Sequence, residues 1–221
     1  MSASTPISPP AAPPWEPELR LTSPGERLAP EVVFGRRARL LIEVGCGNGT
    51  FLAQEAAAHS EVNHLGIERS GEFFAKTRKR MLRHGLANVR LVQAEAGEFF
   101  AERLPAACAT RIVINFSDPW PKRRHRRRRL FRPPFVEHVE RALVPGGELI
   151  FRTDVGWYFN FAVGLLRRRA GWTFLRIGPE APLADEAVTN YERKARQSGS
   201  RVWGFVAAWS VGSPAADEVR R

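Results

Sequence analysis

The hydrophobic positions of this chain form short apolar runs from Leu40 onward, separated by longer stretches with helical spacing. Five of these runs have the length of strands and end in or beside a polar or acidic residue. Strands and helices in alternation predict parallel strands joined by right-handed crossovers. The predicted strands are LLIEV (40–44), VNHLGIE (62–68), VRLVQAE (89–95), RIVINF (111–116) and GELIFRTD (147–154), and helices are predicted near 50–58, 71–84, 97–103, 133–143 and 157–169.

Two late apolar runs, WTFLRIG (172–178) and VWGFVAAW (202–209), predict an antiparallel strand pair that closes the sheet. The predicted fold is therefore α/β, with a Rossmann-like, doubly wound, mostly parallel sheet. In such sheets ligands bind at the carboxyl ends of the strands. The polar and basic segment TNYERKARQSG (189–199) lies between the two runs. It is either a loop that reaches over the ligand site or an ordinary surface loop.

The composition indicates one domain preceded by a tail. Eight of the 17 prolines fall within residues 1–30, which predicts a disordered or extended segment followed by a single domain over 31–221. The two cysteines, Cys46 and Cys108, are too few for a disulfide framework and form no metal-ligand pattern, which favours a reducing, cytoplasmic location without a metal. No apolar run has the length needed to cross a membrane, and the N-terminus lacks the pattern of an export signal.

A glycine-rich turn follows the first predicted strand. In Glu43-Val-Gly45-Cys-Gly47-Asn-Gly49 the three glycines permit a tight turn and leave the backbone open to a ligand. The turn lacks the GxGxxG spacing of dinucleotide folds, so a ligand without phosphates fits better. Glu68 ends the second strand, where a carboxylate can accept from two ribose hydroxyls, and Glu95 ends the third, where adenine recognition is expected. The set favours S-adenosylmethionine over NAD, although either acid alone is better explained as a solvated strand end.

The most unusual segment is NFSDPWPKRRHRRRR (115–129). It places Asp118 in a rigid Pro-Trp-Pro turn and follows it with seven Lys or Arg and one His in eight residues. The stretch from Lys122 to Arg132 holds eight basic residues and no acid, so it carries most of the formal net charge of +11. A localised basic patch favours nucleic acid as a partner. The simpler alternatives are a solvated basic loop and an Asp118 that only stabilises its turn.

These motifs together resemble the bacterial tRNA (guanine-N7-)-methyltransferases, which are class I enzymes that use S-adenosylmethionine. The resemblance runs from about Leu40 to about Trp209 and includes nearly everything except the Pro-rich tail. It depends on EVGCGNG, GIE, NFSDPWPKRRHRRRRL, the RTD at 152–154 and the TNYE at 189–192. It implies a methyltransferase fold, S-adenosylmethionine as cofactor and tRNA as partner, with the variable-loop guanosine 46 as the modified base.

The resemblance also implies roles for individual residues. In the cofactor site, Glu43 is the first contact, Glu68 holds the ribose and Glu95 lies near the adenine, beside the turn of Gly45, Gly47 and Gly49. Asp118 resembles a residue that is both near the cofactor and catalytic. The substrate-binding positions are Lys122, Asp154, Thr189, Asn190, Tyr191 and Glu192, and the RNA-contacting stretch is Arg124, His125, Arg126, Arg127, Arg128 and Arg129.

The acceptor atom determines what the protein has to supply. Guanine N7 has a free lone pair and no proton, so methyl transfer to it needs no general base, and positioning dominates. Asp118 can bind the N1 and N2 donors of the guanine edge or stabilise the charge that develops on the purine, and the first role matches two donors to two carboxylate oxygens. Two alternatives stay open: a methyltransferase for another RNA or protein site, and a non-catalytic RNA-binding protein on a methyltransferase scaffold.

Overall fold

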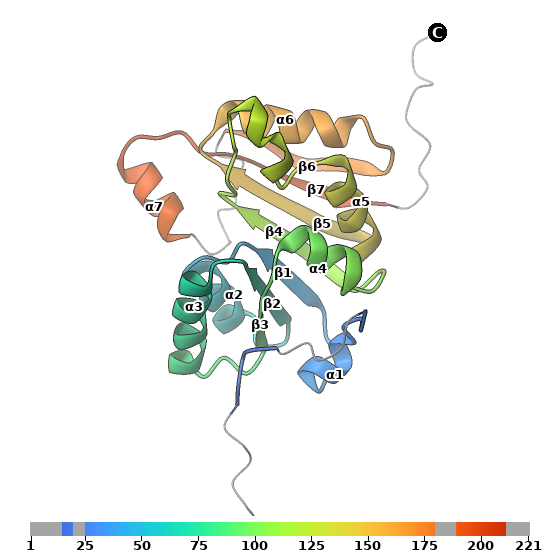
Figure 1. Cartoon of the computed structure of the whole chain (residues 1–221), viewed down its shortest axis with the longest axis vertical. Helices are drawn as coiled ribbons and strands as arrows, with labels where there is room; N and C mark the ends of the chain where they lie inside the picture. Colours follow the sequence, from blue (N-terminus) through green and yellow to red (C-terminus); the bar gives the residue numbers. More distant parts are fainter. Residues whose placement is uncertain (1–14, 20–24, 180–188, 211–221) are drawn as a thin grey trace, which may run out of the picture.

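A sheet of seven strands forms the centre of the molecule, in the order β3-β2-β1-β4-β5-β7-β6 (Figure 1). The computed structural model describes residues 15–19, 25–179 and 189–210. β1 to β5 pair in parallel, and β7 runs antiparallel to both β5 and β6. The strands are β1 (Leu40–Val44), β2 (Asn63–Glu68), β3 (Val89–Gln93), β4 (Ala109–Asn115), β5 (Leu143–Thr153), β6 (Trp172–Pro179) and β7 (Trp203–Trp209).

The strands alternate with helices up to β6, as the periodicity predicts. The α/β fold with a parallel sheet and a late antiparallel pair is confirmed, and the largest shift of a boundary is at β5, which begins at Leu143 rather than at Gly147. The helices are α1 (Pro30–Phe34), α2 (Thr50–Ala58), α3 (Gly71–His84), α4 (Ala96–Glu102), the 3-10 helix η1 (Arg123–Arg128), α5 (Pro133–Ala142), α6 (Gly156–Arg167) and α7 (Asn190–Gln197).

The sequence predicts a loop over 189–199, and this prediction is wrong, because most of the segment is helix α7. Thr189 caps this helix, since its Oγ1 accepts a hydrogen bond from the Glu192 backbone N–H at 2.9 Å. Glu192 and Ala195, three residues apart, are buried, whereas Tyr191, Arg193 and Lys194 are exposed. Among the side chains of α7 that the structure describes, the buried ones are an acid and an alanine, so the sequence lacks the apolar stripe that predicts a helix.

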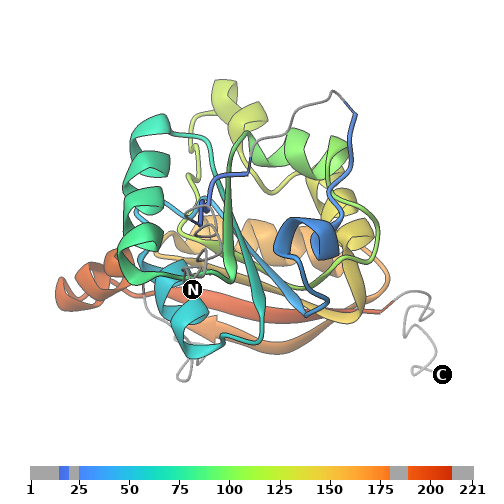
Figure 2. The same cartoon turned by 90° about the horizontal axis from the view of Figure 1, so that it is seen from below.

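Each face of the sheet is covered by its own set of helices (Figure 2). The larger core packs α4, α5 and α6 against alternate strand residues such as Ile42, Ile112 and Phe151, all with no exposed surface. The opposite face packs α2 and α3 over β1 to β3, and there Leu41 and Val113 contact Phe51 of α2. Alternation of side chains along each strand therefore separates two layers of helices.

The first described residues lie along the free edge of β3. Leu91 donates its N–H to the Pro17 carbonyl and accepts from the Leu19 N–H, both at 2.7 Å. Leu28 is buried against the larger core. Residues 1–14 and 20–24, which make up most of the predicted Pro-rich tail, lie outside the described residues. The division of the chain at residue 30 stays a prediction.

Candidate active site

The glycine turn after β1 leaves bare backbone facing open space. Gly45 and Cys46 donate to the Ile67 carbonyl of β2 at 2.8 and 3.2 Å, which folds the turn back over the strand ends. Gly45 and Gly47 have φ of +72° and +55° and only one other atom, the Gly45 carbonyl oxygen at 4.0 Å, close to where a side chain would begin. Gly49 differs, because a Cβ there would lie 2.6 Å from Thr77 Cγ2 of α3. Two of the three glycines therefore leave space for a ligand, and the third lets α2 and α3 pack closely.

A pocket of about 400 Å³ opens beside this turn, at the carboxyl ends of the strands. Five residues that the sequence predicts as cofactor contacts line it: Gly45, Gly47, Glu68, Glu95 and Asp118. The remaining lining residues are Val44, Ile67, Arg69, Ser70, Phe73, Ala94, Ala96, Asn115, Phe116, Ser117, Trp120, Arg128 and Leu130. The pocket therefore contains the glycine turn, the ends of β2 and β3, and the loop after β4 in one place.

Backbone donors hold the carboxylates of Glu68 and Glu95. Glu68 accepts from the Gly47 N–H at 2.9 Å and from the Ser70 N–H at 2.8 Å, one bond to each oxygen. Glu95 caps α4 and accepts from the Glu98 N–H at 3.0 Å. A carboxylate oxygen has more than one acceptor site, so Glu68 can still accept from hydroxyl groups in the pocket. Neither acid is a freely rotating strand-end side chain.

Glu43 lies below the pocket, buried in β1. Its Oε1 accepts from Asn115 Nδ2 at 3.3 Å, and its Oε2 has no hydrogen-bond partner among the described residues. Burial raises the pKa of Glu43 to about 8, against smaller lowering effects from Asn115 and Arg152. Glu43 is therefore a mostly protonated carboxyl group at neutral pH, adjacent to Asn115, which itself lines the pocket.

The loop after β4 has an unusual backbone. Phe116 and Trp120 have φ of +52° and +45°, the left-handed region that side chains rarely adopt. The Phe116 N–H donates to the Arg152 carbonyl of β5 at 2.8 Å, which holds the start of the loop against the sheet. Asp118 lies between these two strained positions, exposed to solvent at the pocket wall. Such strain is typical of functional loops whose geometry is fixed by their surroundings.

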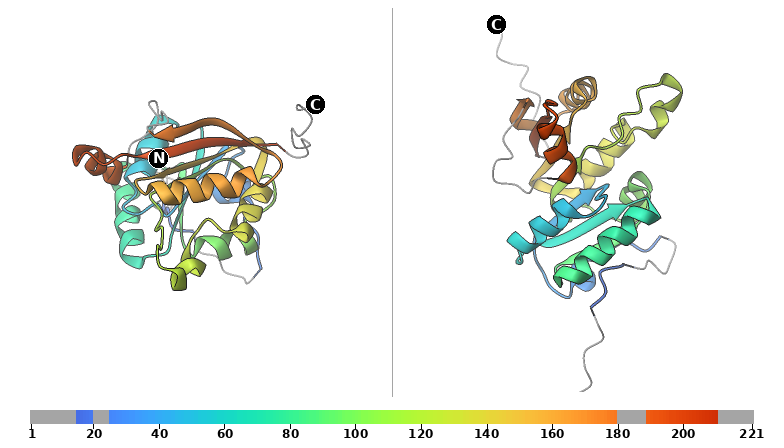
Figure 3. Two further views of the ribbon diagram at one scale, coloured as in Figure 1. Left: turned by 90° about the horizontal axis from the view of Figure 1, so that it is seen from above. Right: turned by 90° about the vertical axis from the view of Figure 1, so that its left-hand side faces the viewer.

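The basic segment continues from this loop as η1, which projects from the body of the molecule in both views of Figure 3. Lys122, Arg124 and the run 126–128 are exposed. Arg129 is different, since its guanidinium donates to the Trp120 carbonyl at 3.0 and 3.1 Å and lies 4.9 Å from the Trp157 ring. Arg129 therefore holds the loop in place. Arg128 lies 4.9 Å from the Trp120 ring and lines the pocket, while Arg124, Arg126 and Arg127 are exposed.

Two of the predicted substrate-binding residues make contact with each other. Tyr191 Oη donates to Asp154 Oδ2 at 3.1 Å, and the Tyr191 ring lies 4.8 Å from the Phe116 ring in the pocket wall. Glu192 is buried and lies 3.8 Å from Arg152 Nη1. The side chain of Asn190 lies outside the described residues. The start of α7 thus adjoins the loop that carries Asp118, and the two rings in contact, Phe116 and Tyr191, are 191 − 116 = 75 residues apart in sequence.

Comparisons with known proteins show the family of this chain. A family described as putative methyltransferase matches residues 37–205. The chain is 35% identical over 181 residues to a tRNA (guanine-N(7)-)-methyltransferase of Nitrosococcus oceani, covering 82% of this chain and 76% of that protein. It is 33% identical over 196 residues to one of Chromohalobacter salexigens, covering 87% and 80%. The chain belongs to the tRNA (guanine-N7-)-methyltransferase family. This is the family that the motifs predicted.

The fold also occurs in methyltransferases outside this family. The 16S rRNA (adenine(1408)-N(1))-methyltransferase of Catenulisporales acidiphilia, solved as a W203A mutant with its cosubstrate S-adenosylmethionine, superposes with a TM-score of 0.57 at 16% identity. The match covers 85% of this chain and 94% of that one. At this identity the likeness shows the shared methyltransferase fold alone.

The pocket of this family member fits S-adenosylmethionine, the cofactor of the family. The open backbone at Gly45 and Gly47 can receive the amino-acid end of the cofactor, and Glu68 can accept from a ribose diol. Glu43 Oε2, buried and without a partner, offers one further acceptor or donor under the turn. No group of His, Cys, Asp and Glu among the described residues is arranged to hold a metal ion.

Sequence reasoning did not identify Asn115, Phe116 or Arg152 as site residues. Asn115 and Phe116 line the pocket, and Arg152 is buried next to Asn115. Arg152 gives a signal in the sequence, because a charged residue within the apolar run GELIFRTD has to be buried with a partner or break the strand. Asn115 and Phe116 give none without the sheet order, which places the end of β4 beside the glycine turn.

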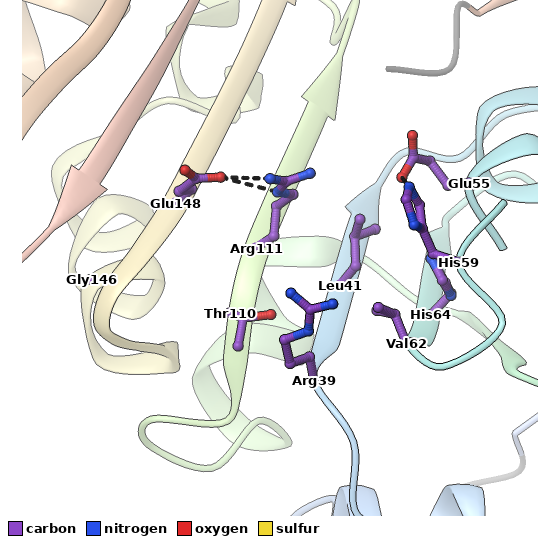
Figure 4. A pocket seen from close by; sticks show the side chains of 10 residues that line it. All are labelled: Arg39, Leu41, Glu55, His59, Val62, His64, Thr110, Arg111, Gly146 and Glu148. Atoms are coloured by element: carbon purple, nitrogen blue, oxygen red, sulfur yellow. Dashed lines mark hydrogen bonds and ion pairs between the residues drawn. The ribbon is translucent and has the colours of Figure 1, made fainter. Parts of the chain in front are cut away.

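A second pocket, of about 350 Å³, lies at the opposite, amino ends of the strands (Figure 4). On one side of it, Arg111 of β4 makes two hydrogen bonds to its neighbour Glu148 of β5, at 2.8 and 3.1 Å. His59 lies 3.9 Å from Glu55 of α2 on the other side. None of the residues predicted as cofactor or substrate contacts lines this pocket.

Among the described residues, no helix is long and apolar enough to span a bilayer.

Proposed function

We propose that this protein transfers the methyl group of S-adenosylmethionine to N7 of a guanine in tRNA, the variable-loop guanosine 46, in the cytoplasm. The observation that supports this best is the single pocket in which Gly47, Glu68 and Asp118 come together from three different strand ends. The rigid loop at this pocket continues directly into the exposed arginines of η1. A cofactor site and a polyanion-binding segment therefore share one edge of the sheet.

The cofactor is held by groups that the fold orients in advance. Gly45 and Gly47 give access to the backbone, Glu68 accepts from the ribose, and Glu95 lies at the pocket wall for the adenine. When bound, S-adenosylmethionine supplies an electrophilic methyl group on a positively charged sulfur. Glu43 lies under the glycine turn, and its raised pKa favours the neutral carboxyl group there, so that no negative charge is buried beneath the ligand.

Asp118 has the central role at the acceptor. Its carboxylate is exposed at the pocket wall and the flanking strained backbone fixes where it points. Two carboxylate oxygens match the N1 and N2 donors of guanine, so Asp118 can hold the base with N7 directed at the methyl group. Alignment at near-attack distance can supply several kcal/mol, up to about ten in favourable cases, and N7 needs no general base.

The rest of the tRNA contacts are divided between two segments. The exposed side chains of Arg124, Arg126, Arg127 and Arg128, together with His125, lie on η1 and can hold phosphates, while Arg129 stabilises the loop. Lys122 lies at the start of η1. The second segment is Asp154 with the start of α7, Thr189, Asn190, Tyr191 and Glu192. Tyr191 is exposed and lies against Phe116 of the pocket wall, whereas Glu192 is buried and supports the segment from below.

The test is incubation of the full chain with labelled S-adenosylmethionine and an unmodified tRNA transcript that carries guanosine at position 46. Nuclease digestion and mass spectrometry of the nucleosides should show 7-methylguanosine. The matched control is the same transcript with adenosine at position 46, which should gain no label. Label at another base would assign a different RNA specificity, and binding of tRNA without methyl transfer would contradict the enzymatic function.

A further inference from the structure

The first turn of α7 connects the helix to the sheet. Tyr191 is tied to Asp154 by a hydrogen bond and to Phe116 by ring contact. The next residue, Glu192, is 2% exposed and reaches Arg152 of β5. Figure 1 shows α7 apart from the two helix layers, beyond the tips of the strand arrows. A helix in this position packs little against the main core, so its orientation depends on side-chain contacts such as these.

Arg152 is the largest fully buried side chain of the described residues, at 1% exposure. It pairs in register with Asn115 of β4 and with Gly204 of β7, so it occupies the middle of the sheet near its carboxyl end. Its Nη1 lies 3.4 Å from Asn115 Oδ1, and its guanidinium lies 5.5 Å from the Phe51 ring. A row of polar groups therefore runs under the pocket from Glu43 through Asn115 and Arg152 to Glu192.

This arrangement requires a counter-charge for the guanidinium. Arginine keeps its charge in proteins, and a buried charge without an opposite charge is strongly destabilising. Glu43, whose pKa is raised by burial, is a poor source of negative charge at neutral pH. In the part of the chain that the structure describes, Glu192 forms an ion pair with Arg152, at 3.8 Å. The sheet thus carries a fixed positive charge that α7 neutralises when it is in place.

We propose that Arg152 is a positioning residue, which fixes the first turn of α7 through Glu192 and thereby places Tyr191 and Asp154 at the acceptor side of the pocket. This inference rests on the proposed function, in which that side holds the guanine. Arg152 does not reach the reacting atoms in this scheme. Its substitution should therefore weaken the use of tRNA much more than the binding of the cofactor.

The position of α7 can be measured without any substrate. Trypsin cleaves after Arg193 and Lys194 in α7, so the rate of cleavage in the folded full chain reports how firmly the helix is held. In Arg152→Met and in Glu192→Gln we expect this rate to rise about tenfold or more, the scale of a lost charge-assisted contact. The matched control is Arg111→Met, which removes the Arg111–Glu148 pair at the amino end of the same strands and should leave cleavage of α7 unchanged. Cleavage at the wild-type rate in both α7 variants overturns the proposal.

Kinetics distinguish positioning from a general loss of structure. Arg152→Met should raise KM for tRNA about tenfold with the cofactor Kd changed less than about threefold, because a lost contact of this kind acts at one side of the pocket only. Equal losses in both parameters would indicate a structural role and overturn the proposal. Should Arg152→Met fold poorly, Arg152→Lys keeps the charge. This variant should give a smaller rise in KM for tRNA, again with little change in the cofactor Kd.

A double-mutant cycle tests the partner. Arg152→Met/Glu192→Gln should be less harmful than the two single changes predict together, because neither partner is then left buried alone. Additive losses would mean that the two residues act independently and would also overturn the proposal. If wild-type protein fails to methylate tRNA, the proposed function fails, and the trypsin rates and the cycle measured by unfolding still decide the role of Arg152.

Discussion

The two ends of the sheet carry pockets of nearly equal size and different chemistry. At the amino ends Arg111 is bound to Glu148 and His59 lies against Glu55, so the charged groups largely satisfy each other (Figure 4). At the carboxyl ends Glu68 and Glu95 accept from backbone N–H groups, and among the described residues neither they nor Asp118 forms an ion pair. Volume does not distinguish the two pockets. The carboxyl-end pocket is suited to a ligand because its carboxylates are held in place by backbone N–H groups and keep acceptor capacity.

Backbone geometry separates the two ends as well. The carboxyl end has the left-handed positions Gly45 and Gly47 and the strained residues Phe116 and Trp120 around one pocket. The amino-end pocket includes one such position, Gly146, with φ +80°. In a parallel sheet, each loop from a strand to the following helix lies at the carboxyl edge. Strained residues and exposed glycine backbone therefore occur together at that edge. This comparison yields four tests.

The largest effect is expected from Asp118→Asn. The variant keeps the size of the side chain and removes the charge that is proposed to hold the guanine, so kcat should fall about 100- to 1,000-fold, as when one preorganised polar group is removed. The cofactor Kd, measured by calorimetry, should stay within about threefold. Glu148→Gln at the amino end serves as the control and should leave kcat unchanged. A variant Asp118→Asn with wild-type kcat would remove Asp118 from the catalytic role.

The next effect is a matched pair of glycine substitutions. Gly47→Ala and Gly146→Ala both place a Cβ on a left-handed residue in open space, at similar cost of about 1–2 kcal/mol in stability. Only Gly47→Ala adds an atom to the cofactor pocket, so it should weaken cofactor binding about 10- to 100-fold while Gly146→Ala leaves it unchanged. Calorimetry with S-adenosylhomocysteine and thermal unfolding measure both quantities. Equal loss of affinity in the two variants would show that strain, not contact, is responsible.

A smaller effect is expected on the salt dependence of tRNA binding. Arg126→Ala/Arg127→Ala removes two exposed cations of η1, and the slope of log Kd against log salt concentration should become shallower by about one per arginine. Arg111→Ala, whose guanidinium is bound to Glu148, is the control and should keep the wild-type slope. Filter binding at several salt concentrations gives the slopes. An unchanged slope in the η1 variant would exclude these side chains from phosphate contact.

The smallest effect concerns stability and pH. The pKa of Glu43 is about 8 in the folded protein and near 4.5 when the chain is unfolded, so its contribution to stability is complete below pH 4.5 and is lost as the pH rises toward 8. Glu43→Gln cannot titrate. The variant should therefore gain stability relative to wild type between pH 5 and 8, by a few kcal/mol at most. Urea unfolding of both proteins at these pH values measures the difference, and a difference independent of pH would show that Glu43 keeps an ordinary pKa.

The parts of the fold that periodicity specifies could be predicted. Apolar runs such as LLIEV and RIVINF are long enough and regular enough to identify strands, and the glycine turn between strand and helix identifies the ligand edge. Helix α7 could not be predicted in this way, because it buries an acid, Glu192, against the charge of Arg152. The role of that pair appears only when β5 and α7 are placed next to each other.

The site shows the same limit. The motifs predict Gly45, Gly47, Glu68, Glu95 and Asp118 as site residues, and all five line one pocket. Glu43 and Gly49 belong to the same motif and lie outside the lining, one beneath the sheet surface and one against α3. A sequence motif identifies residues that a site requires. Which atoms reach the ligand depends on packing between segments far apart in the sequence.

The pairing of Pro17 and Leu19 with Leu91 affects how this protein can be handled. A shortened version that starts at the boundary near residue 30 would leave the outer side of β3 without its hydrogen-bonding partner, and uncovered strand edges invite self-association between molecules. A fragment designed for crystallisation should therefore begin upstream of Trp15.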